Sequence, residues 1–217
     1  MKTKCFAYML AALMVFSLTS TSLLAADKWV SLFDGKTLNG WKQRNGTAKY
    51  SVDNGTILGV TNEGSPNSFL CSQKIYGDFE LLFEVKVDDA LNSGVQIRSA
   101  SKKNFKNYRV HGPQVEIATN GTAGFVYGEA LGTGWLSDKA KVDKKTNAFK
   151  KGEWNKYRVL AVGNSIKTWV NGVPVADLID LKSNMKRGFI GLQVHSIRKG
   201  TGPYKVRWRN IKIRVIK

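Results

Sequence analysis

The stretch "DFELLFEVKVD", residues 78–88, indicates the fold class more clearly than any other part of the chain. Every second residue is apolar, and a period of two places alternate side chains on opposite faces of an extended strand. One face would carry Phe79, Leu81, Phe83, Val85 and Val87. The other face would include Glu80, Glu84 and Lys86. A strand with one apolar and one charged face is half buried, which is typical of a layered β-protein.

Short alternating runs of this kind recur along the chain, and no segment after residue 26 has a sustained helical period. Tight turns are predicted at Asn54-Gly55, Gly163-Asn164 and Asn171-Gly172, because these dipeptides accept the positive φ that hairpins demand. Many short strands joined by turns predict an all-β sandwich or barrel. We expect one domain over residues 27–217, with no internal repeat and no linker.

The first 26 residues have the pattern of a secretory signal peptide. A basic start at Lys2 and Lys4 precedes an apolar run, and small residues follow at Ala25 and Ala26. The apolar run is too short for a membrane span, so the mature form is predicted to have none. An anchor that is never cleaved is the alternative. Export to the periplasm or the outside is therefore expected.

The chain is strongly basic, with 34 Lys and Arg against 16 Asp and Glu and a formal charge of +18. Basic loops such as "SKKNFK" favour anions. The partner could be an acidic polysaccharide or an anionic envelope surface, or the charge could serve solubility alone. Export argues against nucleic acid. Cys71 is the one cysteine after residue 26 and cannot form an internal disulfide.

Three predicted strands carry polar pairs at a spacing of two, so each pair shares one side of its strand. The pairs are Gln96 with Arg98, Gln114 with Glu116, and Gln193 with His195. If the strands are neighbours, six hydrogen-bonding or titratable side chains line one surface, which suits sugar binding or acid-base chemistry. The alternative is an ordinary solvated face with an Arg98–Glu116 ion pair.

The segment "HGPQVEIATNGTAGFVYGEALGTGWL", residues 111–136, adds further candidates. Tyr127 and Trp135 lie in or beside glycine-rich loops, where an aromatic plane can stack on a sugar ring. Packing at the base of a loop is the alternative for both. His111 would lie at the entrance of a strand, and Glu129 follows Tyr127 closely. The segment is interpreted as one wall of a sugar cleft.

Five motifs make the chain resemble the 3-keto-disaccharide hydrolase domain family. They are "WVSLFDGKTLNGWK", "YGDFELLFEVKVD", "NSGVQIRS", "GPQVEI" and "GFIGLQVHS…VRWRNIKI", which occur in this order along residues 27–217. The resemblance implies a concanavalin A-like jelly-roll sandwich with the sugar on its concave face. It also implies an enzyme that cleaves glycosides already oxidised to a ketone at carbon 3.

The residues suit that chemistry better than ordinary glycoside hydrolysis, which needs two carboxylates flanking the bond. The run "QVEIAT" offers only Glu116. A 3-keto sugar has an acidic hydrogen at carbon 2, so one base can start an elimination, and water can add back afterwards. The protein must then supply a base, a stabiliser for the oxyanion and an acid for the leaving group.

The resulting hypothesis assigns roles to all ten candidates. Glu116 or His195 is the base, and Arg98, with Gln114 or Gln96, stabilises the oxyanion. His111 or Glu129 protonates the leaving oxygen. Gln193 contributes to sugar binding, and Tyr127 and Trp135 shape the wall.

No metal site and no cofactor is predicted, because Glu116, His195 and His111 show no ligand spacing. A divalent cation on the keto oxygen is kept as an alternative. Two other functions compete with the enzyme: a non-catalytic carbohydrate-binding module of the same fold, and an anion-binding envelope protein.

Overall fold

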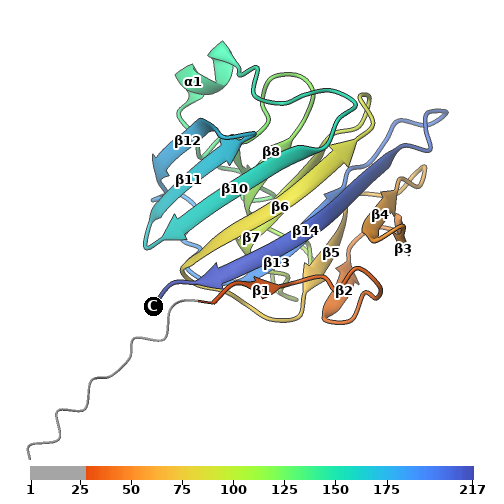
Figure 1. Cartoon of the computed structure of the whole chain (residues 1–217), viewed down its shortest axis with the longest axis horizontal. Coiled ribbons are helices and arrows are strands. Elements are labelled where there is room, and N and C mark those ends of the chain that lie inside the picture. The colour runs from red at the N-terminus through yellow and green to blue at the C-terminus, as the bar shows by residue number, and fades with distance from the viewer. Residues whose placement is uncertain (1–27) are drawn as a thin grey trace, which may run out of the picture.

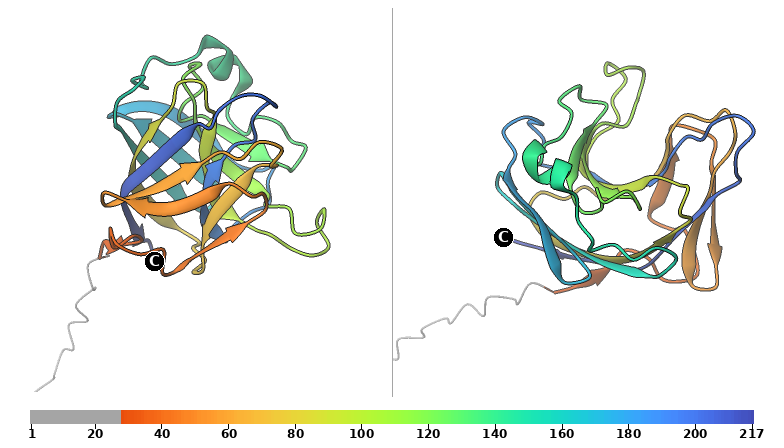
Figure 2. Two further views of the ribbon diagram at one scale, coloured as in Figure 1. Left: turned by 90° about the vertical axis from the view of Figure 1, so that its right-hand side faces the viewer. Right: turned by 90° about the horizontal axis from the view of Figure 1, so that it is seen from above.

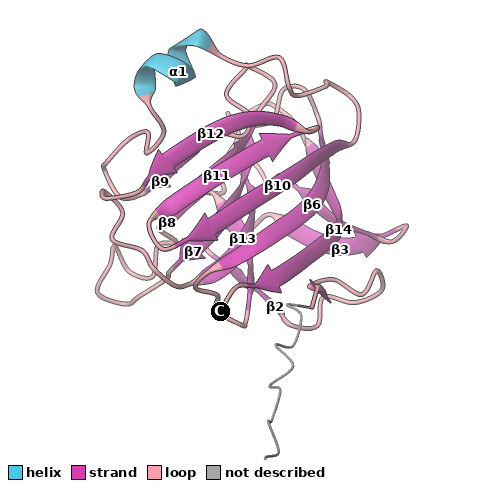
Figure 3. Ribbon diagram, turned by 60° about the vertical axis from the view of Figure 1, so that its left-hand side comes forward, coloured by secondary structure: helices cyan, strands magenta, loops and turns pink. Residues whose placement is uncertain are grey.

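Two antiparallel β-sheets make up the described part of the chain, residues 28–217 of a computed structural model (Figures 1 and 3). The predicted signal peptide, residues 1–26, lies outside the described residues. The two sheets pack face to face around one large apolar core. The prediction of an all-β sandwich is therefore confirmed.

The eight-stranded sheet is built around the strand with which the sequence analysis began. In spatial order its strands are β12 (Val173–Ile179), β11 (Ser165–Val170), β10 (Asn155–Val162), β6 (Phe79–Val87), β14 (Lys205–Val215), β4 (Thr56–Val60) and β3 (Lys49–Asp53), with β1 (Val30–Ser31) also paired to β14. All five predicted inward residues of β6 are at most 3% exposed. On the opposite face Glu80 accepts hydrogen bonds from Arg158 and Arg214 on the two neighbouring strands.

The six-stranded sheet holds the polar pairs. In spatial order its strands are β2 (Trp41–Arg44), β5 (Ser68–Ser72), β13 (Phe189–Val194), β7 (Ser93–Ser99), β8 (Gly112–Ile117) and β9 (Val126–Glu129). The three strands predicted to carry these pairs, β13, β7 and β8, are therefore direct neighbours. The sheet buries its alternate apolar residues against β6 and its neighbours. Valines and leucines such as Val95, Val115 and Leu192 are inaccessible to solvent.

All three predicted hairpins are present. Asn54-Gly55 joins β3 to β4, Gly163-Asn164 joins β10 to β11, and Asn171-Gly172 joins β11 to β12. Asn54 and Asn171 have φ of 48° and 50°, which asparagine tolerates better than most residues. One element was not anticipated: the short helix α1 (Lys139–Lys144), whose first turn is capped by the Asp138 side chain.

The loops on one side of the molecule form two groups. Seen from above, green loops near residues 100–135 stand opposite orange and blue loops near residues 60 and 200 (Figure 2, right). No helix within residues 28–217 has the length and apolar character that crossing a bilayer requires.

Candidate functional site

The register of the six-stranded sheet places four of the six paired candidates on the face turned away from the core. Two rows run across the strands, Gln96–Gln114–Tyr127 and Gln193–Gly94–Glu116. Val95 and Val115, which alternate with them, belong to the core. The strand period and the strand order together therefore produce a polar surface from segments distant in sequence.

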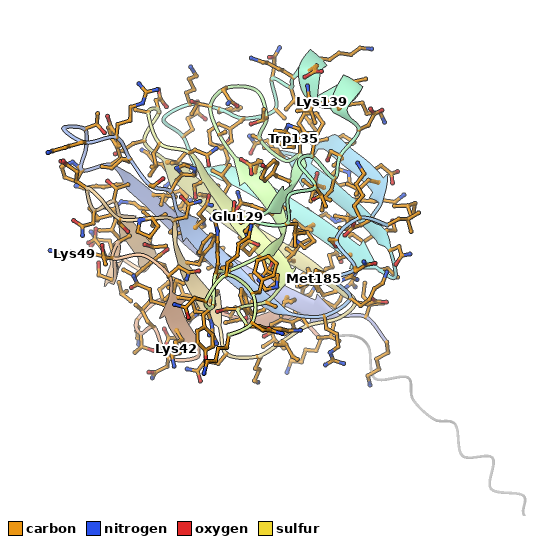
Figure 4. All side chains as sticks on the ribbon, turned by 180° about the vertical axis from the view of Figure 1, so that it is seen from behind. Lys42, Lys49, Glu129, Trp135, Lys139 and Met185 are labelled. Carbon is orange, nitrogen blue, oxygen red and sulfur yellow. The ribbon has the colours of Figure 1, made fainter. Side chains whose placement is uncertain are left out.

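A cavity of about 480 Å³ opens over this surface. Its lining residues are Asn67, Asn92, Lys106, Arg109, Gln114, Glu116, Tyr127, Gly128, Glu129, Ala130, Gly132, Trp135 and His195. Six of the ten predicted residues thus line one cavity, and they come from β8, β9, the loop after β9 and the end of β13. In the view from behind, Glu129 and Trp135 lie over the six-stranded sheet (Figure 4). A volume of this size is typical of small-molecule sites.

Glu116 lies at the end of a buried hydrogen-bond chain. Ser99 Oγ donates to Gln96 Oε1 at 2.6 Å, and Gln96 Nε2 donates to Gln114 Oε1 at 2.6 Å. Gln114 Nε2 then donates to Glu116 Oε1 at 2.7 Å. Asn92 Nδ2 donates to the other carboxylate oxygen at 3.2 Å. The chain fixes which way the Gln114 amide points, so a donor always faces the carboxylate.

Two glycines make room for this chain. A Cβ on Gly94 would lie 2.6 Å from Gln114 Cγ, and one on Gly112 would lie 2.3 Å from Ser99 Oγ. Both distances are far below van der Waals contact. The glycines in "NSGVQIRS" and "HGPQVEI" are therefore needed for the packing of the polar side chains around Glu116.

Burial raises the pKa of the Glu116 carboxyl to about 7. Its side chain is almost inaccessible, with 6% of the residue exposed, and the charged form is poorly solvated there. The hydrogen bonds from Gln114 and Asn92 act in the opposite direction, and the charge of Glu129 raises the pKa further. A carboxyl that titrates near neutrality can both accept and return a proton at working pH.

His195 directly follows β13 and faces the cavity with one ring nitrogen available. Its Nδ1 lies 2.7 Å from the Ser196 carbonyl oxygen, which can only accept, so Nδ1 carries a hydrogen. The other nitrogen, Nε2, is left to a ligand. Asn67 holds the same turn, because its Oδ1 accepts from Ser196 N at 2.9 Å.

Two cations from the loop between β7 and β8 complete the cavity wall, and sequence reasoning missed both. Arg109 lies 3.6 Å from Glu129, and Lys106 Nζ donates to the Ala130 carbonyl at 3.3 Å. A loop carries no periodicity, so nothing local assigns its side chains to a site. The available signal was the run of basic residues directly before "HGPQVEI".

Tyr127 and Trp135 form an aromatic corner of the cavity. Their ring centroids lie 5.3 Å apart at an interplanar angle of 78°, an edge-to-face arrangement. A β-bridge between the same two residues holds the loop against β9. Both rings therefore line the cavity, and their role in holding a sugar stays a prediction.

The prediction that Arg98 lies in the site is wrong. Its guanidinium donates to the carbonyls of Gly77 and Gly163 and pairs with Asp78 at 2.8 Å. Arg98 has φ of 49°, and β7 loses its regular register with β13 near this point. The strand period therefore fails there, and the side chain leaves the polar face. The alternative of an Arg98–Glu116 ion pair is wrong as well.

His111, Gln96 and Gln193 do not line the cavity directly. His111 is 6% exposed, stacks on Phe105 with centroids 3.7 Å apart, and bonds through Nδ1 to the Arg109 carbonyl. It therefore supports the loop that carries Arg109. Gln96 and Gln193 are fully buried beneath the cavity. Among the described residues neither polar atom of the Gln193 side chain has a hydrogen-bond partner.

Within residues 28–217 no group of three or more His, Cys, Asp or Glu side chains is arranged to hold a metal ion.

Comparison with solved structures shows the same fold in carbohydrate-related proteins. A Parabacteroides distasonis protein named "putative glycosyl hydrolase" has a TM-score of 0.62 and 21% identity, over 87% of this chain and 94% of its own. A second protein so named from that organism has a TM-score of 0.59 and 24% identity, over 87% and 100%. Carbohydrate-binding module CBM66 from Bacillus subtilis has a TM-score of 0.50 and 18% identity, over 81% and 95%. No curated protein matches the chain.

The family comparison covers nearly all of the described residues. The model of the 3-keto-alpha-glucoside-1,2-lyase-like domain matches residues 28–214. The match includes both sheets and every residue of the cavity. The chain belongs to the family of the 3-keto-alpha-glucoside-1,2-lyase-like domain.

Proposed function

We propose that this protein is an exported enzyme that cleaves 3-keto-glycosides by proton abstraction and elimination, with water adding back to give net hydrolysis. The observation that carries the proposal is Glu116, a buried carboxyl with a pKa of about 7 that faces a cavity of sugar-binding character. The family match supports the substrate class.

In the first step Glu116 removes the hydrogen at carbon 2 of the keto sugar. The electron pair of that C–H bond forms the double bond between carbons 2 and 3, and the ketone becomes an enolate. Arg109 and Lys106 are the cations of the cavity wall, so they replace Arg98 as the groups that stabilise the enolate oxygen.

In the second step the ketone re-forms, a double bond appears between carbons 1 and 2, and the bond from carbon 1 to the leaving oxygen breaks. A protonated His195 gives its Nε2 proton to that oxygen. Water then adds its hydroxyl at carbon 1 and gives its remaining proton to Nε2 of His195, while Glu116 returns a proton to carbon 2. This yields the free 3-keto sugar and restores both residues to their starting states.

The contacts of Glu129 argue against an ordinary pair of hydrolytic carboxylates. Glu129 on β9 lies opposite Gly112 on β8, and its charge raises the pKa of Glu116. Arg109 also pairs with Glu129, which gives this carboxylate the role of holding the cation.

Incubation with a 3-keto disaccharide in D₂O tests the proposal. The wild type should release a 3-keto monosaccharide that carries deuterium at carbon 2, because the Glu116 carboxyl exchanges its proton with solvent before returning it. Chromatography and mass spectrometry measure the product. Glu116→Gln should lower turnover at least 1000-fold, whereas Glu153→Gln, an exposed carboxylate outside the cavity, should leave it unchanged. Turnover that survives Glu116→Gln would refute the assignment of the base.

A carbohydrate-binding module is the second candidate, because Tyr127 and Trp135 would hold a sugar without any chemistry. Micromolar binding of unoxidised oligosaccharides by the wild type, with no turnover of any 3-keto glycoside, would favour this function over the first.

A further inference from the structure

A second cavity of about 410 Å³ adjoins the first one over the six-stranded sheet. Its lining residues are Asn45, Gly46, Pro66, Asn67, Phe69, Lys106, Arg109, His195 and Ser196. Asn67, Lys106, Arg109 and His195 line both cavities, so these four residues mark the junction. The two cavities therefore form one cleft with two compartments.

The second compartment has the chemistry of a sugar subsite. Exposed Pro66 supplies apolar surface, which suits the carbon face of a sugar ring, and Phe69, which is buried, closes the wall beneath it. Asn67 uses its Oδ1 to accept from Ser196 N, which leaves the amide N–H₂ as a donor for a hydroxyl. Directed donors around a small apolar patch are the usual composition of a small-molecule site.

The walls of this compartment are held in place before any ligand binds. Asn45 Oδ1 accepts from Val110 N at 2.6 Å and its Nδ2 donates to the Tyr108 carbonyl at 3.3 Å. These bonds join the turn after β2 to the loop that carries Lys106 and Arg109. Gly46 packs so closely that a Cβ on it would lie 2.0 Å from Ser68 Oγ.

A buried polar side chain lies beneath the junction of the two compartments and lines neither of them. Gln193 lies opposite Phe69 on one side and opposite Gly94 on the other, and Gly94 in turn faces Glu116. The Gln193 amide is fully buried and has no hydrogen-bond partner within residues 28–217. An unpartnered buried amide is costly in a purely structural role, and here it lies on the face that both compartments share.

We infer that the second compartment binds the leaving-group sugar, which places the scissile bond at the junction beside His195. This inference rests on the proposed function. The keto sugar occupies the first compartment over Glu116, and the bond from carbon 1 to the bridging oxygen crosses to the second. That bond breaks, and the Nε2 proton of His195 passes to the bridging oxygen. Contacts in the second compartment therefore favour a sugar over a small aglycone as the leaving group.

Pro66→Trp tests the subsite, because Pro66 lines only the second compartment and its exposed ring makes no side-chain hydrogen bond. The measured quantity is the ratio of kcat/KM for a 3-keto disaccharide to kcat/KM for the methyl 3-keto-glucoside. The ratio should exceed ten in the wild type and fall at least tenfold in Pro66→Trp. Pro174→Trp on the exposed edge strand β12 is the control and should keep the wild-type ratio. An unchanged ratio in Pro66→Trp would overturn the inference.

The role of His195 as proton donor to the leaving group is tested by a separate measurement. A nitrophenolate leaves without a proton, so His195→Asn should slow the 3-keto disaccharide at least tenfold more than the nitrophenyl 3-keto-glucoside. Equal losses of rate on both substrates would show that His195 does not protonate the leaving oxygen.

A binding measurement separates this inference from the proposed function. Calorimetry on Glu116→Gln should show at least tenfold tighter binding of the disaccharide than of the methyl glucoside, and adding Pro66→Trp should abolish the difference. If this pattern holds while the wild type turns over no 3-keto glycoside, the subsite stands and the enzymatic proposal fails. Equal affinities of Glu116→Gln for the disaccharide and the methyl glucoside would refute the subsite.

Discussion

Replacing Gln114 by methionine should lower the ionised fraction of Glu116 at neutral pH by raising its pKa. Methionine has a similar length but cannot donate the 2.7 Å hydrogen bond to Glu116 Oε1. That bond stabilises the charged carboxylate, so its loss favours the protonated form. Burial, the main cause of the raised pKa, is unchanged by the substitution.

The size of the effect follows from the bond that is lost. A hydrogen bond to a charged group is worth about 1.5–3 kcal/mol, and one pKa unit corresponds to about 1.4 kcal/mol. The pKa should therefore rise by about 1–2 units from its present value of about 7. At pH 7 the ionised fraction would fall from about one half to roughly 1–10%. Turnover limited by this base should fall about tenfold at pH 7 and recover near pH 9.5.

The assay is the pH profile of kcat/KM on the nitrophenyl 3-keto-glucoside, whose leaving group needs no proton from His195, together with a carboxyl carbon NMR titration of Glu116. Gln43→Met is the control, because Gln43 on β2 donates to the Ala48 carbonyl and lies outside the cavity. A lower rate that does not recover at high pH, with the Glu116 titration unmoved, would refute the reasoning.

Three further results are expected. The pKa of Glu116 is about 7 in the folded protein and 4.5 in the unfolded chain. Between these pH values the folded state binds more protons than the unfolded state, so stability falls as pH rises from 4.5 to 7. From pH 4.5 to pH 8 the free energy of unfolding of the wild type should therefore drop by about 3 kcal/mol relative to Glu116→Gln in urea titrations; parallel curves would contradict the buried-carboxyl assignment. Arg98→Met should cost about 3 kcal/mol of stability, because it leaves buried carbonyl oxygens without a hydrogen-bond donor. The enzyme that remains folded should keep the wild-type kcat. A loss of kcat without a loss of stability would show that Arg98 belongs to the site. Trp135→Ala should weaken disaccharide binding about tenfold, because it loses an aromatic contact of about 1–1.5 kcal/mol, whereas Trp169→Ala on the other sheet should not. Equal affinities of Trp135→Ala and the wild type, measured by calorimetry, would show that Trp135 does not contact the sugar.

Local periodicity is sufficient for much of the fold. The alternation of residues 79–87 predicts the buried face of β6, and the Asn-Gly turns predict two of the hairpins. The same reasoning places Gln114 and Glu116 on one side of β8, because side-chain direction in a regular strand depends only on parity. These features need no knowledge of which strands are neighbours.

What the sequence by itself determined is thus the class of elements, their faces and the family motifs, since each depends on residues close together in the chain. Only the tertiary structure decided that Arg98 turns away at a positive φ, that Lys106 and Arg109 reach the cavity from a loop, and that Glu116 is buried enough to titrate near neutrality. Strand register, burial and loop position arise from contacts between segments tens of residues apart, and no local pattern encodes them.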